Sequence, residues 1–229
     1  QIRGMGNPLL VFTGGDPLKR PDLEPLIRHA VGLGLRLSIT PSGTSLLDQP
    51  AVQRFKELGI ARMALSLDAP TQAEHDAFRG VEGSFQWTVD ACRYAAEAGL
   101  SLQINTSISR HNLHQIPQMA ALVESLGAVM WSVFFVVPTG RAQADQNLSP
   151  EEFEAAFAQI HAAAQKKVFD VKTTEAPHYR RYLLQHHAGP NAAAAGPLPR
   201  MHGGLGDGRG FVFVSHTGDV FPSGFLPLA

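Results

Sequence analysis

The sequence contains a single cysteine, Cys92, among its 229 residues. One thiol cannot form an internal disulfide, and such sparing use of cysteine fits a reducing compartment, so we expect a cytoplasmic protein. Iron–sulfur clusters usually need several thiolates, so this chain cannot hold such a cluster with its own cysteines.

Long apolar runs and basic clusters are also missing. The longest apolar stretch, residues 129–138, is too short to cross a bilayer, and no secretory signal opens the chain. The formal net charge is −1, and no group of Lys and Arg is large enough to follow a phosphate backbone. We therefore expect no membrane insertion and no nucleic-acid partner.

What the chain does contain is a regular alternation of strand-like and helix-like segments. Five apolar strand-like runs alternate with segments whose apolar residues recur at helical spacing, and glycines close several of these segments. This alternation predicts a parallel α/β sheet, either a barrel or a doubly wound open sheet. In both cases the chemistry gathers at the carboxyl ends of the strands. The predicted strands are residues 8–12, 35–40, 60–67, 100–108 and 129–137.

The first strand ends abruptly at Gly14, Gly15, Asp16 and Pro17. Its unbroken Leu, Val and Phe run predicts a strand covered on both faces. Paired glycines let the backbone approach a ligand, and Pro17 directs Asp16 away from helical geometry. The turn therefore offers carbonyls beside a carboxylate, which suits an ammonium group, although an ordinary tight turn also needs glycine.

Several other local patterns carry structural predictions. Ser84 is expected to cap a helix, and residues 149–152 read Ser-Pro-Glu-Glu, the pattern of a capping box. Residues 171–174 are strand-like, and residues 211–222 read as a β-hairpin. The Gly-, Pro- and Ala-rich residues 188–210 between them read as a linker.

Four motifs at strand ends resemble the radical S-adenosylmethionine (SAM) superfamily. Residues 13–18 resemble its Gly-Gly-Glu-Pro turn, with Asp16 in place of Glu. Residues 66–69 with 75–80, residues 103–106 and residues 136–141 resemble its fourth, fifth and sixth strand regions. The resemblance implies a partial parallel (β/α)6 TIM-like barrel that lacks its first strand. It is closest to the branch that makes haem and other cofactors.

The same resemblance implies a domain order. Residues 1–187 would form the partial barrel, residues 188–210 a linker, and residues 211–229 the start of a C-terminal SPASM or twitch-like extension. The family's Cys-x3-Cys-x2-Cys loop is absent. We expect it upstream in an intact protein, because the chain starts without Met.

The resemblance also implies a set of SAM contacts. Gly14, Gly15 and Asp16 would hold the methionyl ammonium group. Ser66 and Asp68 would lie near the methionine carboxylate or the ribose, although Asp68 could instead cap the following segment. Asn105 suits ribose recognition, because its amide both donates and accepts. The full set of predicted cofactor-binding residues is Gly14, Gly15, Asp16, Pro17, Ser42, Ser66, Asp68, Asn105, Val136, Val137 and Pro138.

An intact member of this family would bind SAM at a 4Fe-4S cluster and cleave it to a 5′-deoxyadenosyl radical. Its partners would be a small-molecule or peptide substrate and an electron donor such as ferredoxin or flavodoxin. The candidates for the substrate side are Glu175, His178, Arg180 and Arg181, where His178 could move a proton. A solvated helix end explains these four residues as well.

Two further arginines and two histidines have alternative roles. Arg79 and Arg141 could pair with a carboxylate of SAM or of a substrate, or form surface ion pairs. His111 and His114 have a spacing that could suit zinc, but no third ligand is near in sequence, so an exposed turn is favoured.

Two other functions remain open. One is a cluster-free relative that binds a substrate or acts as a scaffold. The other is an unrelated barrel lyase or aldolase, which would need a lysine or metal ligands at the strand ends. The predicted turns offer only Lys19.

Overall fold

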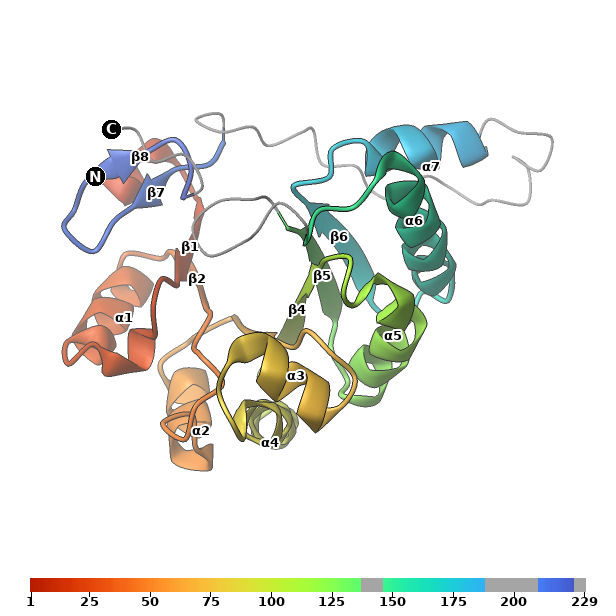
Figure 1. Cartoon of the computed structure of the whole chain (residues 1–229). Helices are drawn as coiled ribbons and strands as arrows, with labels where there is room; N and C mark the ends of the chain where they lie inside the picture. The colour runs from red at the N-terminus through yellow and green to blue at the C-terminus, as the bar shows by residue number, and fades with distance from the viewer. Residues whose placement is uncertain (137–145, 188–209, 225–229) are drawn as a thin grey trace.

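The computed structural model describes residues 1–136, 146–187 and 210–224. Six parallel strands form one sheet in the order of the sequence, which confirms the predicted partial barrel. The sheet curls, and the connecting helices lie around its outer side (Figure 1). The strands are β1 (Leu9–Phe12), β2 (Arg36–Ile39), β3 (Arg62–Ser66), β4 (Leu102–Ile108), β5 (Met130–Phe135) and β6 (Asp170–Thr174).

Seven α-helices are present among the described residues. Helix α6 begins with the predicted capping box, in which Ser149 and Glu152 each bond the other's backbone N–H. The helices are α1 (Leu23–Gly32), α2 (Gln49–Glu57), α3 (Gln72–Arg79), α4 (Ser84–Glu97), α5 (Ile116–Ser125), α6 (Pro150–Gln165) and α7 (Tyr179–His187). Short 3-10 helices are η1 (Ile2–Met5), η2 (Pro17–Lys19) and η3 (Leu113–Gln115).

The hydrophobic core lies between the sheet and its helices. Along β4 burial alternates, so that Leu102, Ile104 and Ile108 are buried under the helices while Gln103 and Asn105 are half-buried on the other side. We call this other side the concave face. Cys92 of α4 belongs to the core, where burial raises the pKa of its thiol to about 12.

The prediction that the first strand is covered on both faces is wrong. Among the described residues, β1 lies at the edge of the sheet and pairs with β2. Leu10 and Phe12 pack against the core, but Leu9 and Val11 are exposed on the concave side. A run of apolar residues does not reveal whether both faces of a strand are covered, because the elements that would cover them lie elsewhere in the chain.

The predicted cap of α4 is also wrong. Gly83 is the N-cap residue, and the side chain of Ser84 donates to Asp76 instead of capping the helix. The carboxylate of Asp76 accepts hydrogen bonds from the backbone N–H groups of Gly83 and Phe85. The cap therefore comes from α3, a helix that the apolar spacing does not predict.

The C-terminal part of the chain differs in one respect from the sequence prediction. Residues 171–174, which stand apart from the five predicted alternations, belong to β6 and extend the main sheet. The predicted hairpin is confirmed as β7 (Phe213–Val214) paired antiparallel with β8 (Val220–Phe221). Its assignment to a SPASM or twitch-like extension stays a prediction, and the predicted linker lies almost entirely outside the described residues. None of the described helices is long and apolar enough to cross a membrane.

Candidate functional site: the carboxyl edge of the sheet

The turns after β1 and β2 meet at the carboxyl edge of the sheet. The backbone N–H of Thr40 donates to the carbonyl of Phe12 at 2.8 Å, which holds the two strand ends together. The hydroxyl of Ser42 then donates to the carbonyl of Gly15 at 3.3 Å. Gly14 has φ 118°, a conformation that side chains rarely adopt, so the turn requires glycine there.

Asp16 connects the same two turns. Its backbone is extended, as the following Pro17 predicts, and it begins η2 by accepting from the N–H of Leu18 at 3.2 Å. Its carboxylate also accepts from the Ser42 N–H and the Thr44 hydroxyl, each at 3.4 Å. All three donors are neutral, and no described Lys, Arg or His forms an ion pair with Asp16. An accessible carboxylate without a cation is a receptor for a positively charged group.

Gly43 fixes the second turn against helix α4. A Cβ atom at this position would lie 2.1 Å from the hydroxyl oxygen of Thr88, which is buried. Only glycine fits so close to the helix, and the spacing of turn residues in the sequence does not reveal this contact.

Ser66 and Asn105 are direct neighbours across β3 and β4. The side-chain oxygen of Asn105 accepts from the Gln103 amide at 2.8 Å. Within the described residues, neither the Asn105 NH2 group nor the Ser66 hydroxyl donates a hydrogen bond to another side chain or carbonyl. The structure thus brings these two predicted residues together, with donors available on the concave face.

Asp68 is fully buried, unlike Asp16. One carboxylate oxygen accepts from the Ser107 N–H at 2.7 Å, and the other forms an ion pair with Arg79 at 2.6 Å. Within the described residues, the ion pair with Arg79 is the only polar contact of that second oxygen. Its backbone groups bond His75 and Asn112 at 3.1 and 2.8 Å. Asp68 therefore joins β3, β4 and α3 and offers no surface to a ligand, and Arg79 forms an internal ion pair.

His75 completes this buried group. It is 1% exposed, and its Nδ1 atom accepts the hydrogen bond from the Asp68 N–H, so the ring is neutral. Burial lowers the pKa of His75, and the negative charge of Asp68 only partly opposes this effect.

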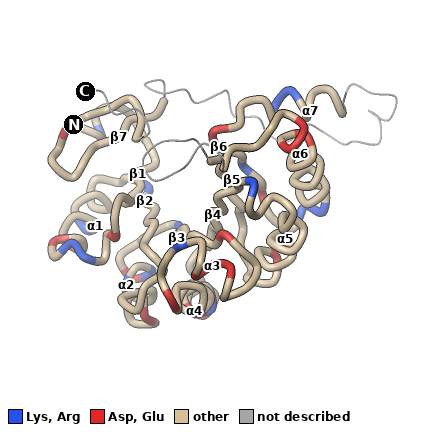
Figure 2. Tube along the Cα trace, viewed as in Figure 1, with Lys and Arg blue, Asp and Glu red and all other residues tan. Residues whose placement is uncertain are grey.

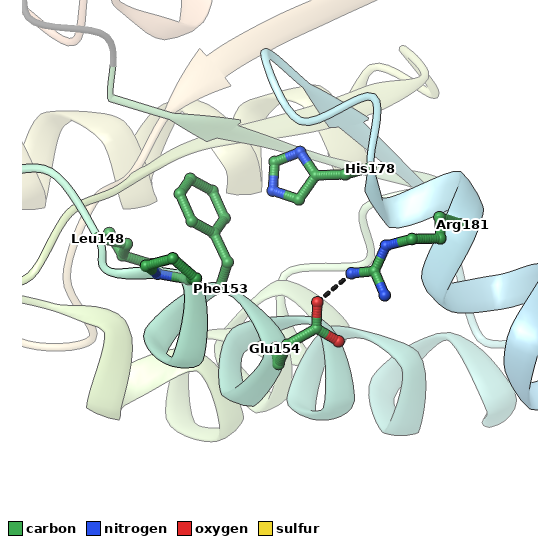
Figure 3. Close-up of a pocket in the computed structure, with 6 residues that line it drawn as sticks. Leu148, Phe153, Glu154, His178 and Arg181 are labelled. Atoms are coloured by element: carbon green, nitrogen blue, oxygen red, sulfur yellow. Dashed lines mark hydrogen bonds and ion pairs between the residues drawn. The ribbon is translucent and has the colours of Figure 1, made fainter.

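The predicted substrate-side residues lie elsewhere, between α6 and α7. His178 and Arg181 line a pocket of about 380 Å³ with Phe153 and Glu154 (Figure 3). Arg181 forms an ion pair with Glu154, and the His178 ring stands edge-on to Phe153 at 4.6 Å. Burial and the nearby Arg181 lower the pKa of His178. The described lining of this pocket includes none of the residues at the ends of β1–β4, and Glu175 and Arg180 are exposed outside it.

The remaining predicted residues fall in two groups. Val136 follows β5 and donates its N–H to the Ile108 carbonyl at 3.1 Å, which places it at the same edge as Asn105. Val137, Pro138 and Arg141 lie outside the described residues. The described residues contain no group of three or more His, Cys, Asp and Glu that could hold a metal ion, so the zinc interpretation of His111 and His114 gains no support.

Several charged residues of the concave face are absent from the sequence predictions, and Lys172 is one of them. Lys172 is exposed in the middle of β6, paired in register with Ser132 of β5. Its position becomes visible only once β6 is known to belong to the main sheet. Val171, the residue before Lys172, packs against the core. The alternation of sides along a strand is therefore the signal that could have placed Lys172 on the concave face.

This curled parallel sheet and its glycine turn are those of one enzyme superfamily. Residues 2–123 match the family model described as the radical SAM superfamily, and the chain belongs to that superfamily.

The chain is similar over nearly its whole length to proteins of haem synthesis. It is 40% identical over 230 residues to an AdoMet-dependent heme synthase of Nitratidesulfovibrio vulgaris, covering 98% of this chain and 62% of that protein. It is 28% identical to an Fe-coproporphyrin III synthase of Methanosarcina barkeri, covering 98% of this chain and 58% of that protein. The chain thus spans about three fifths of the length of these curated relatives.

A solved structure confirms the fold. The structure of Streptococcus suis SuiB bound to S-adenosylmethionine matches 96% of this chain and 50% of its own, with a TM-score of 0.69 at 16% identity. Identity this low establishes the fold alone.

The two cofactors of the superfamily fit this chain differently. The open turn of Gly14 and Gly15 with the Asp16 carboxylate suits the ammonium group of SAM. A 4Fe-4S cluster does not fit these residues, because the one cysteine of the sequence is buried in the core on α4.

Proposed function

We propose that this chain is the SAM-binding part of a radical SAM enzyme that modifies a tetrapyrrole in haem synthesis. The observation that carries the proposal is Asp16, whose carboxylate accepts only neutral donors and has no cation among the described residues. The family membership and the names of the haem-synthesis relatives support the rest.

In this proposal the chain's own residues bind and orient SAM. Asp16 and the carbonyls of the first turn receive its ammonium group, while Ser66 and Asn105 hydrogen-bond its ribose. Val136 lies beside its adenine, and the predicted contacts of Val137 and Pro138 fall outside the described residues. A 4Fe-4S cluster, which cysteines outside this chain would hold, would supply the electron for cleavage of SAM. The proposed electron donor is a protein such as ferredoxin or flavodoxin.

In this proposal Asp68 does not contact SAM but supports the residues that do. It ties the end of β3 to the N–H of Ser107 on β4, the strand that carries Asn105. We therefore assign Asp68 and Arg79 to positioning Ser66 and Asn105 at the ribose.

The experiment uses the protein that contains this chain, prepared anaerobically with its cluster verified by absorbance. We expect it to produce 5′-deoxyadenosine from SAM under a strong reductant, measured by chromatography, and to change the mass of an added iron porphyrin. A verified cluster that yields no 5′-deoxyadenosine would contradict the SAM-cleaving function. Cleavage of SAM with no change to any porphyrin would contradict the tetrapyrrole substrate alone.

Peptide modification is the second substrate class. SuiB is also similar in fold when bound to its precursor peptide SuiA, with a TM-score of 0.66. A fold likeness at 15% identity carries less weight than the haem-synthesis relatives, so the tetrapyrrole is preferred.

A further inference from the structure

The concave face of the sheet is positively charged, whereas the chain as a whole is not. Its inward-facing strand residues include the cations Arg36, Arg62 and Lys172 and a single acid, Asp170, which gives a net charge of +2. The formal net charge of the entire sequence is −1. On the outer helices, basic and acidic residues are interspersed (Figure 2). The excess of positive charge is thus a local property of this face.

Lys172 is placed on this face by the packing of its own strand. Val171, the residue before it, packs against the core, so Lys172 extends to the opposite side of the sheet. Lys172 is exposed, and no described residue forms an ion pair or hydrogen bond with its ammonium group. This cation is available for an external partner.

Lys172 also lies in line with the proposed SAM-binding residues. Ser66 pairs with Asn105, Asn105 with Ser132, and Ser132 with Lys172, so these four polar residues form one row across β3–β6. Neighbouring strands are about 4.8 Å apart, which places the backbone of Lys172 about 10 Å from that of Asn105. A molecule bound between them would contact SAM at one end and the ammonium group at the other.

The amino end of the same face contains a second positive group. The Nε atom of Arg62 is buried without a hydrogen-bond partner, and its Nη1 atom contacts the Met130 sulfur at 3.4 Å. Burial, together with the charge of Arg36, lowers the pKa of Arg62, and Asp170 opposes this effect. Arg36 and Arg62 together outnumber Asp170, so this end of the face also has a net positive charge.

We infer that Lys172 binds a carboxylate of the substrate and sets the substrate's position relative to SAM. The inference rests on the proposed function and adds to it the residue that recognises the substrate's charge. Tetrapyrroles of haem synthesis carry propionate side chains on a flat apolar ring. An ammonium group beside the half-buried apolar side chains of Met130 and Phe134 matches both properties.

The test measures porphyrin binding to the intact protein by absorbance titration. The two probes are Fe-coproporphyrin III and its tetramethyl ester, which has the same ring without the carboxylate charges. We expect Lys172→Met to raise the Kd of the acid about tenfold and to leave the Kd of the ester unchanged. Lys172→Arg should retain most of the affinity, because it keeps the charge.

The controls separate this inference from the proposed function. Lys166→Met, at the exposed end of α6, removes the same charge away from the concave face and should leave both Kd values unchanged. SAM affinity and the melting temperature of Lys172→Met should match those of the wild type. Equal weakening of acid and ester, or no weakening of either, would refute the role of Lys172 alone. A wild type that binds neither porphyrin would refute the proposed substrate as well.

Discussion

The segments after β1 and β3 both place an aspartate just beyond the carboxyl end of a strand, yet the two aspartates have opposite environments. Asp16 accepts three neutral donors at 3.2–3.4 Å and stays accessible. Asp68 has no exposed surface and pairs with Arg79. The comparison shows that a position at the end of a strand does not decide whether an aspartate binds a ligand or supports the structure. The partners decide, because Arg79 forms an ion pair with one carboxylate, whereas no described cation pairs with the other.

Removing the buried aspartate should have the largest effect. Asp68→Ala is expected to reduce the free energy of unfolding by about 3 kcal/mol, because it leaves the Ser107 N–H and Arg79 without their partner. Urea denaturation followed by circular dichroism measures this change. Asp68→Asn keeps one acceptor and should lose less. A loss under about 1 kcal/mol for Asp68→Ala would contradict the structural role assigned to the carboxylate.

The opposite pattern is expected for the accessible aspartate. Asp16→Asn should change the free energy of unfolding by less than about 1 kcal/mol, because its hydrogen bonds are long and the amide oxygen can still accept them. The same change should weaken SAM binding about tenfold or more, because the amide lacks the charge that attracts the ammonium group. Isothermal titration with SAM checks this. Unchanged SAM affinity would remove the main support for the proposed SAM site.

The second turn offers a test of the scaffold behind Asp16. Gly43→Ala is expected to cost about 1–3 kcal/mol of unfolding free energy, because the new methyl group overlaps the Thr88 hydroxyl. Combining it with Thr88→Ala should recover part of that loss, which a double-mutant cycle quantifies. Additive losses would show that the overlap is relieved by a shift of the turn instead.

The smallest expected effect is the pH dependence of stability that arises from His75, the histidine beside the buried Asp68. The ordinary pKa of histidine is about 6.5, and burial lowers the pKa of His75 in the folded state. Below that pH the unfolded chain therefore binds more protons than the folded chain does. The contribution of His75 to stability is therefore fully present above that pH, and it is lost as the pH falls toward the pKa of His75 in the folded state. His75→Asn keeps an acceptor for the Asp68 N–H and should flatten this dependence in melting experiments between pH 7 and pH 5. His29→Asn, on exposed helix surface, should not.

The local features of the fold are predictable from sequence because they depend on nearby residues. The alternation of strands and helices and the capping box at Ser149 are examples. The features that the sequence does not reveal depend on distant contacts. Asp76 caps α4 from another helix, and the position of β1 in the sheet depends on which strands pair with one another.

The candidate site divides in the same way. Gly14, Gly15 and Asp16 are recognisable because the turn chemistry is contained in consecutive residues. Asp68 cannot be distinguished from Asp16 by pattern, since its partner Asn112 is 44 residues away. Lys172 joins the concave face only through the register of β5 and β6. His178 and Arg181 are functional-group residues that packing places between two helices.

The burial of Cys92 has a practical consequence for maturation of the protein. A thiol whose pKa is about 12 carries almost no thiolate near neutral pH, and the thiolate is the form that coordinates iron. While the core is intact, this sulfur does not compete with other ligands for delivered iron. Alkylating reagents should reach it only after the chain unfolds, which makes it an internal probe of the integrity of the domain.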